Sequence, residues 1–276
     1  MRVACVGHVE WIEFARVDRV PAPGEIVHAL ETWEEPGGGG AVSAVQLAKL
    51  AGGATFFTAL GDDEVGHRVH RELEALGLRV EAAWRDEPQR RGFVFIDAAG
   101  ERTITVIGSR LGAGEADPLP WIQLAGADAV YFTAGDAGAV SAARASKRMV
   151  ATTRALDSLR DAGERVDALV ASANDESERY ETGDLSPEPD LVIRTAGAAG
   201  GDWTRSDGET GRWEATPLSG PISDAYGCGD SFAGGVTFGL GAGQDIAGAL
   251  KIGARCGAAC FTGRGPYSAQ LTDHGD

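Results

Sequence analysis

The 276-residue chain carries 41 acidic and 25 basic side chains, which gives a formal net charge of −16, and 43% of its residues are hydrophobic. This length suits one large α/β domain with a full core. The negative charge argues against nucleic acid or an anionic membrane as a partner. It does not exclude a small anionic ligand, because local backbone N–H donors bind phosphate inside acidic proteins.

The cysteines and the apolar runs indicate the cellular compartment. The four cysteines form no C-x-x-C pair and no zinc spacing. No apolar run approaches the roughly 20 residues of a membrane span. The first residues contain no signal-peptide core or cleavage pattern. We therefore expect a reduced, cytoplasmic protein.

Buried strands alternate with helices along most of the chain. The apolar patterns predict strands at 3–6, 54–60, 127–133, 149–152, 167–172, 190–195 and 212–216. They predict helices at 41–50, 64–76, 139–162 (with the strand 149–152 inside it), 231–240 and 245–261. This alternation favours one doubly wound, mainly parallel sheet flanked by helices.

Four further segments alternate polar and apolar residues. They are 8–14, 26–33, 91–97 and 102–107, the last two joined as a hairpin. We expect them to form a small β-sheet that projects from the main body as a lid, over about 9–35 and 90–108. The chain 1–276 is then a single domain with a lid.

The stretch Asp224–Phe232 joins a glycine turn to an apolar helix. Gly227 and Gly229 permit a tight turn, and the helix N-terminus that follows has free N–H groups that attract phosphate. Asp230 in the first turn is placed to take a proton from a hydroxyl that attacks phosphorus. The alternative is a glycine turn whose acidic residue only favours the helix dipole, and these nine residues alone leave the two interpretations even.

A second glycine run, Pro36–Gly40, precedes an alanine-rich helix. Glycines there allow a ligand to approach the backbone closely, and the alternative is a flexible linker. No G-x-G-x-x-G follows the first strand, which argues against a dinucleotide oxidoreductase.

The order of these motifs resembles the ribokinase-like (pfkB) carbohydrate kinases over nearly the whole chain. The segment Asp224–Phe232 is similar to the family's D-T-x-G-A-G-D-x-F signature. Weaker matches are Pro21–Glu25, Pro36–Gly40, Leu60–Gly66, Gly100–Thr103 and Thr195–Gly200. The resemblance implies a ribokinase-like, Rossmann-like three-layer fold and transfer of the γ-phosphoryl group of ATP to a hydroxyl, usually CH₂OH, of a sugar or nucleoside.

The resemblance also implies roles for individual residues. Asp230 is the base, and the N–H groups of Gly227, Cys228 and Gly229 form the anion hole. The residues implied in ATP binding are Asn174, Thr195, Gly197 and Gly200, and those implied in sugar binding are Gly37 and Gly38. The resemblance further implies Mg²⁺ near Asn174, and a K⁺ site formed by Asp224, the Tyr226 carbonyl and the loop 263–265.

Three positions depart from the family pattern. Val42 replaces an asparagine, and Ile12 replaces an aspartate, with Glu10 and Glu13 nearby. Either glutamate is a candidate for binding a sugar hydroxyl, and the alternative is that both face solvent. The family's N-x-x-E becomes Asn174-x-x-Ser177, so Glu176 or Glu178 is the candidate for magnesium.

The sequence therefore predicts an ATP-dependent sugar kinase, with a homodimer through the lid as a possible assembly. One alternative is a nucleoside kinase, in which Trp11 and Trp33 stack on the base. The other is a catalytically weak, kinase-like protein that binds a sugar or nucleotide in regulation. Cys228 replaces the signature's alanine, and its place at a helix N-terminus predicts a lowered thiol pKa and inhibition by oxidation or alkylation.

Overall fold

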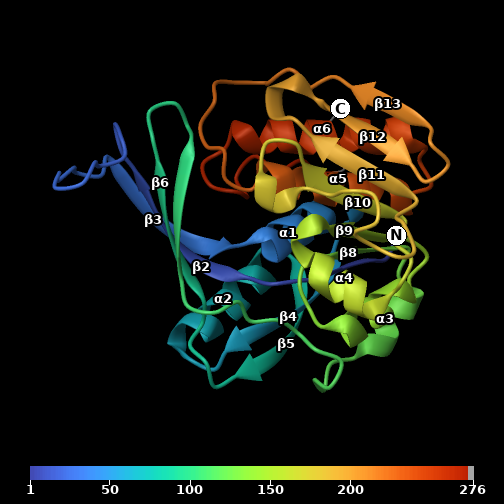
Figure 1. The fold of residues 1–276 in the computed structure, drawn as a ribbon. Coiled ribbons are helices and arrows are strands. Elements are labelled where there is room, and N and C mark those ends of the chain that lie inside the picture. The colour runs from blue at the N-terminus through green and yellow to red at the C-terminus, as the bar shows by residue number, and fades with distance from the viewer. Residues whose placement is uncertain (273–276) are drawn as a thin grey trace.

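The computed structural model describes residues 1–272. Nine strands form one sheet in the order β13-β12-β11-β10-β9-β8-β1-β4-β5. The strands from β11 to β5 pair in parallel, and β12 and β13 add an antiparallel edge. These strands are β1 (Val3–Val6), β4 (Ala54–Gly61), β5 (Leu78–Arg85), β8 (Ala129–Phe132), β9 (Met149–Thr152), β10 (Ala168–Ser172), β11 (Leu191–Thr195), β12 (Gly201–Arg205) and β13 (Thr210–Trp213). The predicted doubly wound, mainly parallel sheet is confirmed (Figure 1).

Helices cover both faces of this sheet. The helices are α1 (Gly39–Ala51), α2 (Glu64–Ala75), α3 (Ala137–Arg144), α4 (Leu156–Ala162), α5 (Cys228–Gly241) and α6 (Ile246–Phe261), with short 3-10 turns η1 (Trp121–Gly126), η2 (Thr153–Ala155), η3 (Glu176–Glu178) and η4 (Gly197–Ala199). Side chains of α1, α2, α5 and α6 pack in one buried cluster, and those of α3 and α4 pack in another.

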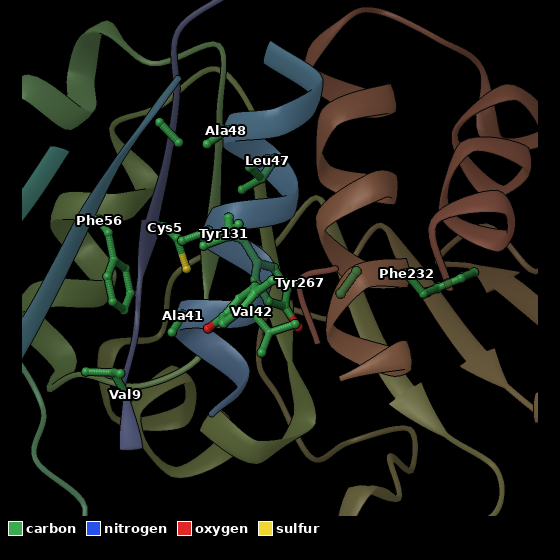
Figure 2. Packing of buried hydrophobic residues seen from close by; sticks show 14 of the residues in the cluster. Cys5, Val9, Ala41, Val42, Leu47, Ala48, Phe56, Tyr131, Phe232 and Tyr267 are labelled. Atoms are coloured by element: carbon green, nitrogen blue, oxygen red, sulfur yellow. The ribbon is translucent and has the colours of Figure 1, made fainter. Parts of the chain in front are cut away.

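Alternation along the strands separates the two clusters. Cys5 and Tyr131 belong to the cluster with α1 and α5, whereas Val6 and Phe132 belong to the cluster with α3 and α4. Successive side chains of a strand point to opposite faces, so each strand contributes to both cores. Figure 2 shows α1 in the middle of the first cluster, between Phe56 on the sheet and Phe232 on α5.

Small residues let the start of α1 lie close to the end of β1. A Cβ on Gly40 would lie 2.5 Å from the His8 carbonyl oxygen, and a Cβ on Gly7 would lie 2.8 Å from the Gly40 Cα. The run 36–40 is therefore not a flexible linker, because it passes directly from a strand into a helix that is packed against the sheet.

A second, four-stranded sheet projects from the main body (Figure 1). Its order is β3-β2-β6-β7, and we call it the lid. The strands are β2 (Glu10–Arg16), β3 (Glu31–Gly37), β6 (Arg91–Ile96) and β7 (Arg102–Ile107). The strand expected at 26–33 is wrong in position, because 26–30 precede β3 and the strand continues to Gly37.

The lid contacts the segment that leads into α5. The Ala225 N–H donates to the Gly100 carbonyl at 3.0 Å, and Arg102 Nη1 donates to the Ala225 carbonyl at 3.2 Å. Phe14 of β2 stacks on Trp33 of β3, with centroids 4.8 Å apart, and meets Tyr226 edge-on at 5.1 Å. These contacts fix the lid against the residues just before the glycine turn.

Two strands of the main sheet were missed in the sequence analysis, and one helix begins earlier than predicted. The strands β5 and β12 were not predicted; β5 is an edge strand with two exposed and four half-buried positions, and β12 is short and mostly half-buried, so neither shows a continuous apolar run. The α5 helix begins at Cys228 rather than at 231, so Asp230 lies inside it.

Replacing Phe14 tests the packing of the lid. We expect Phe14→Ala to lower the free energy of unfolding by about 3–5 kcal/mol, because it removes a fully buried ring between the lid and the core. Ile104→Ala on β7, whose residue is 42% exposed, is the control and is expected to change stability by less than about 0.5 kcal/mol. Chemical denaturation measures both; equal effects would show that Phe14 does not connect the lid to the core.

Candidate active site

The turn before α5 leaves three backbone donors unused. Gly227 adopts φ +78°, and a Cβ there would lie 2.9 Å from Pro266 and 3.0 Å from Val42, so only glycine fits. Ser231 N–H makes the first helical bond, to the Gly227 carbonyl, at 2.8 Å. Within residues 1–272 the N–H groups of Gly227, Cys228 and Gly229 have no acceptor. Free N–H groups at a helix N-terminus attract anions.

Asp230 lies beside the beginning of α1. Its Oδ1 would be 2.7 Å from a Cβ on Gly39, and the Ser43 hydroxyl donates to its backbone carbonyl at 3.0 Å. The carboxyl thus lies between the two glycine-containing helix starts. A side chain at position 39 would collide with it, which gives Gly39 a role that the sequence prediction did not assign.

The surroundings of Asp230 suit a base that works near neutral pH. Burial raises the pKa of Asp230 to about 6, and Glu178 and Glu10 also raise it, whereas the positive charges of Arg154 and Arg102 lower it. A carboxyl with this pKa is mostly ionised at pH 7 and is a stronger base than an ordinary aspartate.

The start of α1 faces the same space. Gly38 has φ +85°, and its N–H donates to the Tyr226 hydroxyl at 2.9 Å. A Cβ on Gly37 would lie 2.6 Å from that hydroxyl, and a Cβ on Gly38 would lie 3.2 Å from the His8 ring. Gly37 therefore packs against protein, whereas Gly38 lies against His8 and Glu10 at the base of the lid.

The two candidate glutamates of β2 lie on opposite faces of the strand. Glu10 is buried, with Oε1 at 2.8 Å from Arg90 Nε and 3.9 Å from His8 Nε2. Burial raises the pKa of Glu10, and the positive charge of Arg90 lowers it. Glu13 is half-buried and forms an ion pair with Arg91 on the other face. Only Glu10 lies beside His8 and Gly38.

His8 was not predicted from the sequence as a site residue. It is 5% exposed, and its Nδ1 is buried with no hydrogen-bond partner among residues 1–272. Burial and the positive charges of Arg110, Arg90 and Arg154 lower the pKa of His8 to about 3. A neutral imidazole therefore lies with its Cδ2–Nε2 edge against Gly38, while its Nδ1 is buried and without a partner among residues 1–272.

The residues predicted for the nucleotide follow two neighbouring strands. Asn174 follows β10, and Thr195 ends β11. A Cβ on Gly197 would lie 3.8 Å from Asn174 Nδ2, so the structure brings these two segments together. Gly200 has φ +76°, and a Cβ there would lie 2.0 Å from the Trp213 carbonyl oxygen, so this glycine shapes the turn into β12.

Two of the positions predicted for cations, Glu178 and Asp224, have protein partners. Glu178 pairs with Arg154, and Glu176 is exposed. Asp224 is fully buried, and its carboxylate accepts from the Tyr226 N–H at 2.8 Å and the Gly265 N–H at 3.0 Å. No group of three or more His, Cys, Asp or Glu within residues 1–272 is arranged to hold a metal ion.

Val42 and Ile12, two of the residues that depart from the family pattern, serve in packing. Both side chains are fully buried. Val42 lies against Gly227, and Ile12 Cγ1 would lie 2.5 Å from a Cβ on Gly37. These two residues therefore support the glycine turns rather than line open space. At the third departure, the Ser177 hydroxyl donates to Asp175.

The predicted low pKa of the Cys228 thiol is wrong. The neighbouring Cys260 thiol and burial raise the pKa of Cys228 above its ordinary value. The Cys260 thiol in turn contacts the Tyr226 carbonyl, with sulfur and oxygen 3.5 Å apart.

With this geometry in view, comparison with known proteins identifies the fold. The ribokinase of Cryptococcus neoformans var. grubii serotype A in complex with ADP superposes with a TM-score of 0.76 at 22% identity, over 99% of this chain and 97% of that one. The adenosine kinase of Sinorhizobium meliloti gives a TM-score of 0.77 at 20% identity, over 96% and 95%. The chain has the ribokinase fold.

The sequence comparisons identify the family. The model of the pfkB family carbohydrate kinases matches residues 1–273, so the chain belongs to that family. An ATP-dependent ribose-1-phosphate kinase of Halopiger xanaduensis is 29% identical over 293 aligned positions, covering 99% of this chain and 96% of that protein. The protein is a sugar or nucleoside kinase of the ribokinase family. No helix in residues 1–272 has the length and apolar character to cross a membrane.

Labelling of Cys228 tests its electrostatic surroundings. At pH 7 we expect iodoacetamide to modify Cys228 at least about tenfold more slowly in the folded protein than in urea, because a raised pKa reduces the thiolate fraction. Peptide mass spectrometry resolves each cysteine. Equal or faster labelling in the folded protein would indicate that the pKa of the Cys228 thiol is lowered, as the helix N-terminus alone predicts.

Proposed function

We propose that the protein transfers the γ-phosphoryl group of ATP to a hydroxyl, in particular a CH₂OH group, of a sugar or sugar derivative. The single observation that carries this proposal is the juxtaposition of Asp230 with the three unused amides of residues 227–229. An anion hole and a base at one helix start supply the two elements that phosphoryl transfer needs.

In this mechanism Asp230 accepts the proton of the acceptor hydroxyl as its oxygen bonds to the γ-phosphorus. The bond from the γ-phosphorus to the β,γ-bridging oxygen breaks, and ADP leaves with that oxygen. The N–H groups of Gly227, Cys228 and Gly229 stabilise the charge on the transferring group. Both parts are held by the backbone of α5, so their relative position is fixed before substrate binds.

The nucleotide is proposed to lie along the segments after β10 and β11, where Asn174 and Gly197 meet. Magnesium is proposed to accompany ATP, since this ion binds mainly through phosphate oxygens and one or two carboxylates, and Glu176 and Glu178 follow Asn174. When bound, Mg²⁺ neutralises charge on the phosphates. The proposed step does not require potassium, and Asp224, the residue expected beside it, is fully buried and accepts two backbone hydrogen bonds.

Two observations favour a sugar over a nucleoside. Trp11 is 3% exposed, with the guanidinium of Arg68 over its ring at 4.1 Å. Trp33 stacks on Phe14, and Arg264 lies 5.2 Å from its ring centroid. The rings that a nucleoside base would need for stacking are therefore already engaged. The remaining alternative is a catalytically weak binding protein, which was suggested by the departures from the family pattern. Val42 and Ile12 are two of these departures, and because both are buried packing residues they do not argue for lost activity.

Replacing the base tests the proposed mechanism. We expect Asp230→Asn to lower kcat by about 10²–10⁴ while the affinity for an ATP analogue stays within twofold, because the amide cannot accept the proton. Asp207→Asn, on the exposed turn between β12 and β13, is the matched control and is expected to behave as wild type. Near-normal turnover in Asp230→Asn would refute the assignment.

The pH dependence tests the electrostatics of the same group. We expect kcat/KM with free ribose to fall about tenfold per pH unit below pH 6, because protonated Asp230 cannot act as base. Arg154→Gln removes a positive charge that lowers the pKa of Asp230, so the acid limb is expected to move to higher pH. ATP ionises in the same way in both assays, so the difference between the pH profiles of wild type and Arg154→Gln reports on the enzyme alone. An acid limb that stays in place or moves down would contradict this account.

A further inference from the structure

The turn between β6 and β7 connects the lid to the segment before α5. The Ala225 N–H donates to the Gly100 carbonyl at 3.0 Å, and Arg102 Nη1 donates to the Ala225 carbonyl at 3.2 Å. The lid therefore holds Ala225 on both sides, two residues before Gly227, where the unused backbone donors begin. This turn has no part in the mechanism proposed above, although it carries a cation to the residues just before the free amides.

A second lid arginine holds the same segment, and its charge is compensated. Arg16 Nη1 donates to the Ser223 carbonyl at 3.0 Å, while its Nε lies 3.5 Å from a Glu31 carboxylate oxygen. Arg102 forms no ion pair with any of residues 1–272, and its side chain makes no hydrogen bond there other than the one to Ala225. Arg102 thus keeps its full positive charge and most of its five N–H donors.

The surroundings of Arg102 distinguish it from an ordinary surface arginine. Burial raises the pKa of Asp230, and Arg102 is one of two positive charges that oppose this rise. The pKa of Asp175, in the segment proposed for the nucleotide, is lowered mainly by hydrogen bonds from Ser177, and Arg102 contributes. The guanidinium therefore lies within electrostatic range of both the base and the nucleotide segment, and its bond to Ala225 fixes it beside the amide turn.

The other cation that acts on Asp230 is already engaged. Arg154 pairs with Glu178 and, at 3.3 Å, with Asp175. Of the two arginines, only Arg102 has no carboxylate partner among the described residues. It is also exposed, so a substrate can reach it. A phosphoryl group in transfer spreads negative charge over its oxygens, and the three amides of residues 227–229 carry no net charge to balance it.

We propose that Arg102 is a catalytic residue contributed by the lid, and that its free N–H groups donate to the oxygens of the transferring phosphoryl group. The inference rests on the proposed kinase function and adds a residue to it. The guanidinium stays protonated throughout, and the bonds that form and break are those given above. Because its bond to Ala225 directs the guanidinium, fast transfer requires the lid to be seated against this segment.

Replacing Arg102 tests this role in turnover. Arg102→Gln removes the charge but keeps an N–H donor for the Ala225 carbonyl. We expect it to lower kcat with free ribose by at least about 100-fold, while KM for ATP and for ribose stays within about threefold, because the lost contact is made in the transition state. Arg102→Lys keeps the charge without the paired donors, so its kcat is expected to lie between the two.

Arg16→Gln is the matched control, because it changes the other lid arginine that donates to this segment. Its kcat is expected to equal that of wild type. Thermal unfolding checks that both glutamine variants are folded, which the exposure of Arg102 leads us to expect. A wild-type kcat in Arg102→Gln overturns the inference. So does a raised KM for ATP or ribose that accounts for the whole loss, since it would assign the arginine to binding of the ground state.

A transition-state analogue tests the contact without turnover. In calorimetry with magnesium present, Arg102→Gln is expected to weaken binding of ADP with aluminium fluoride at least about tenfold and to leave binding of ADP alone unchanged. Equal affinity of wild type and variant for the fluoride complex overturns the inference. If this affinity falls as expected but the wild type transfers no phosphoryl group to any sugar, the proposed function fails and the contact of Arg102 with the phosphoryl position stands.

Discussion

The structure depends on the meeting of two glycine-containing helix starts, those of α1 and α5, at the end of β1. Small residues allow this approach: Gly40 lies against the His8 backbone, and a Cβ on Gly234 would lie 3.0 Å from the Ser43 carbonyl oxygen. The approach sets Asp230 over Gly39 and brings the N-termini of the two helices together. Helix N-termini attract anions, so two of them beside one carboxyl define where charge is held and where a proton is taken.

This arrangement explains how an acidic protein can act on phosphate. The net charge of −16 is a property of the whole surface, whereas the site has backbone donors and arginines. Backbone amides carry no net charge and cost no side-chain entropy when they bind, so the anion hole is rigid before substrate arrives. The arginines then modulate the carboxyl, since Arg154 and Arg102 hold the pKa of Asp230 below the value that burial and the nearby glutamates would give it.

Much of the fold followed from the sequence, because periodic apolar patterns and glycine turns are local signals. The sheet, the glycine turn and the position of Asp230 in the first turn of a helix were predicted in this way. The strands β5 and β12 were missed because exposed and half-buried residues interrupt them, so neither has a continuous apolar run. Arg110, Arg154 and His8 were missed for a different reason: single residues in separate loops meet only through the strand order, and no spacing in the sequence records that.

The sequence also failed to predict the charge states of some residues, for a similar reason. The thiol of Cys228 has the helix N-terminus that the sequence shows, but its pKa follows Cys260, which is 32 residues away in the chain and adjacent in space. Likewise, the two candidate glutamates of β2 looked equivalent until the pleat placed Glu10 beside His8 and Glu13 beside Arg91. Long-range neighbours decide charge state, and they are fixed by topology rather than by local sequence.

The central claim is tested most directly by a crystal structure with ADP, aluminium fluoride and a sugar acceptor. The account predicts that the planar fluoride lies within hydrogen-bond distance of the N–H groups of Gly227, Cys228 and Gly229, with the acceptor oxygen between the metal fluoride and the Asp230 carboxylate. A fluoride bound elsewhere, or a carboxylate of Asp230 that points away from the acceptor oxygen, would contradict it.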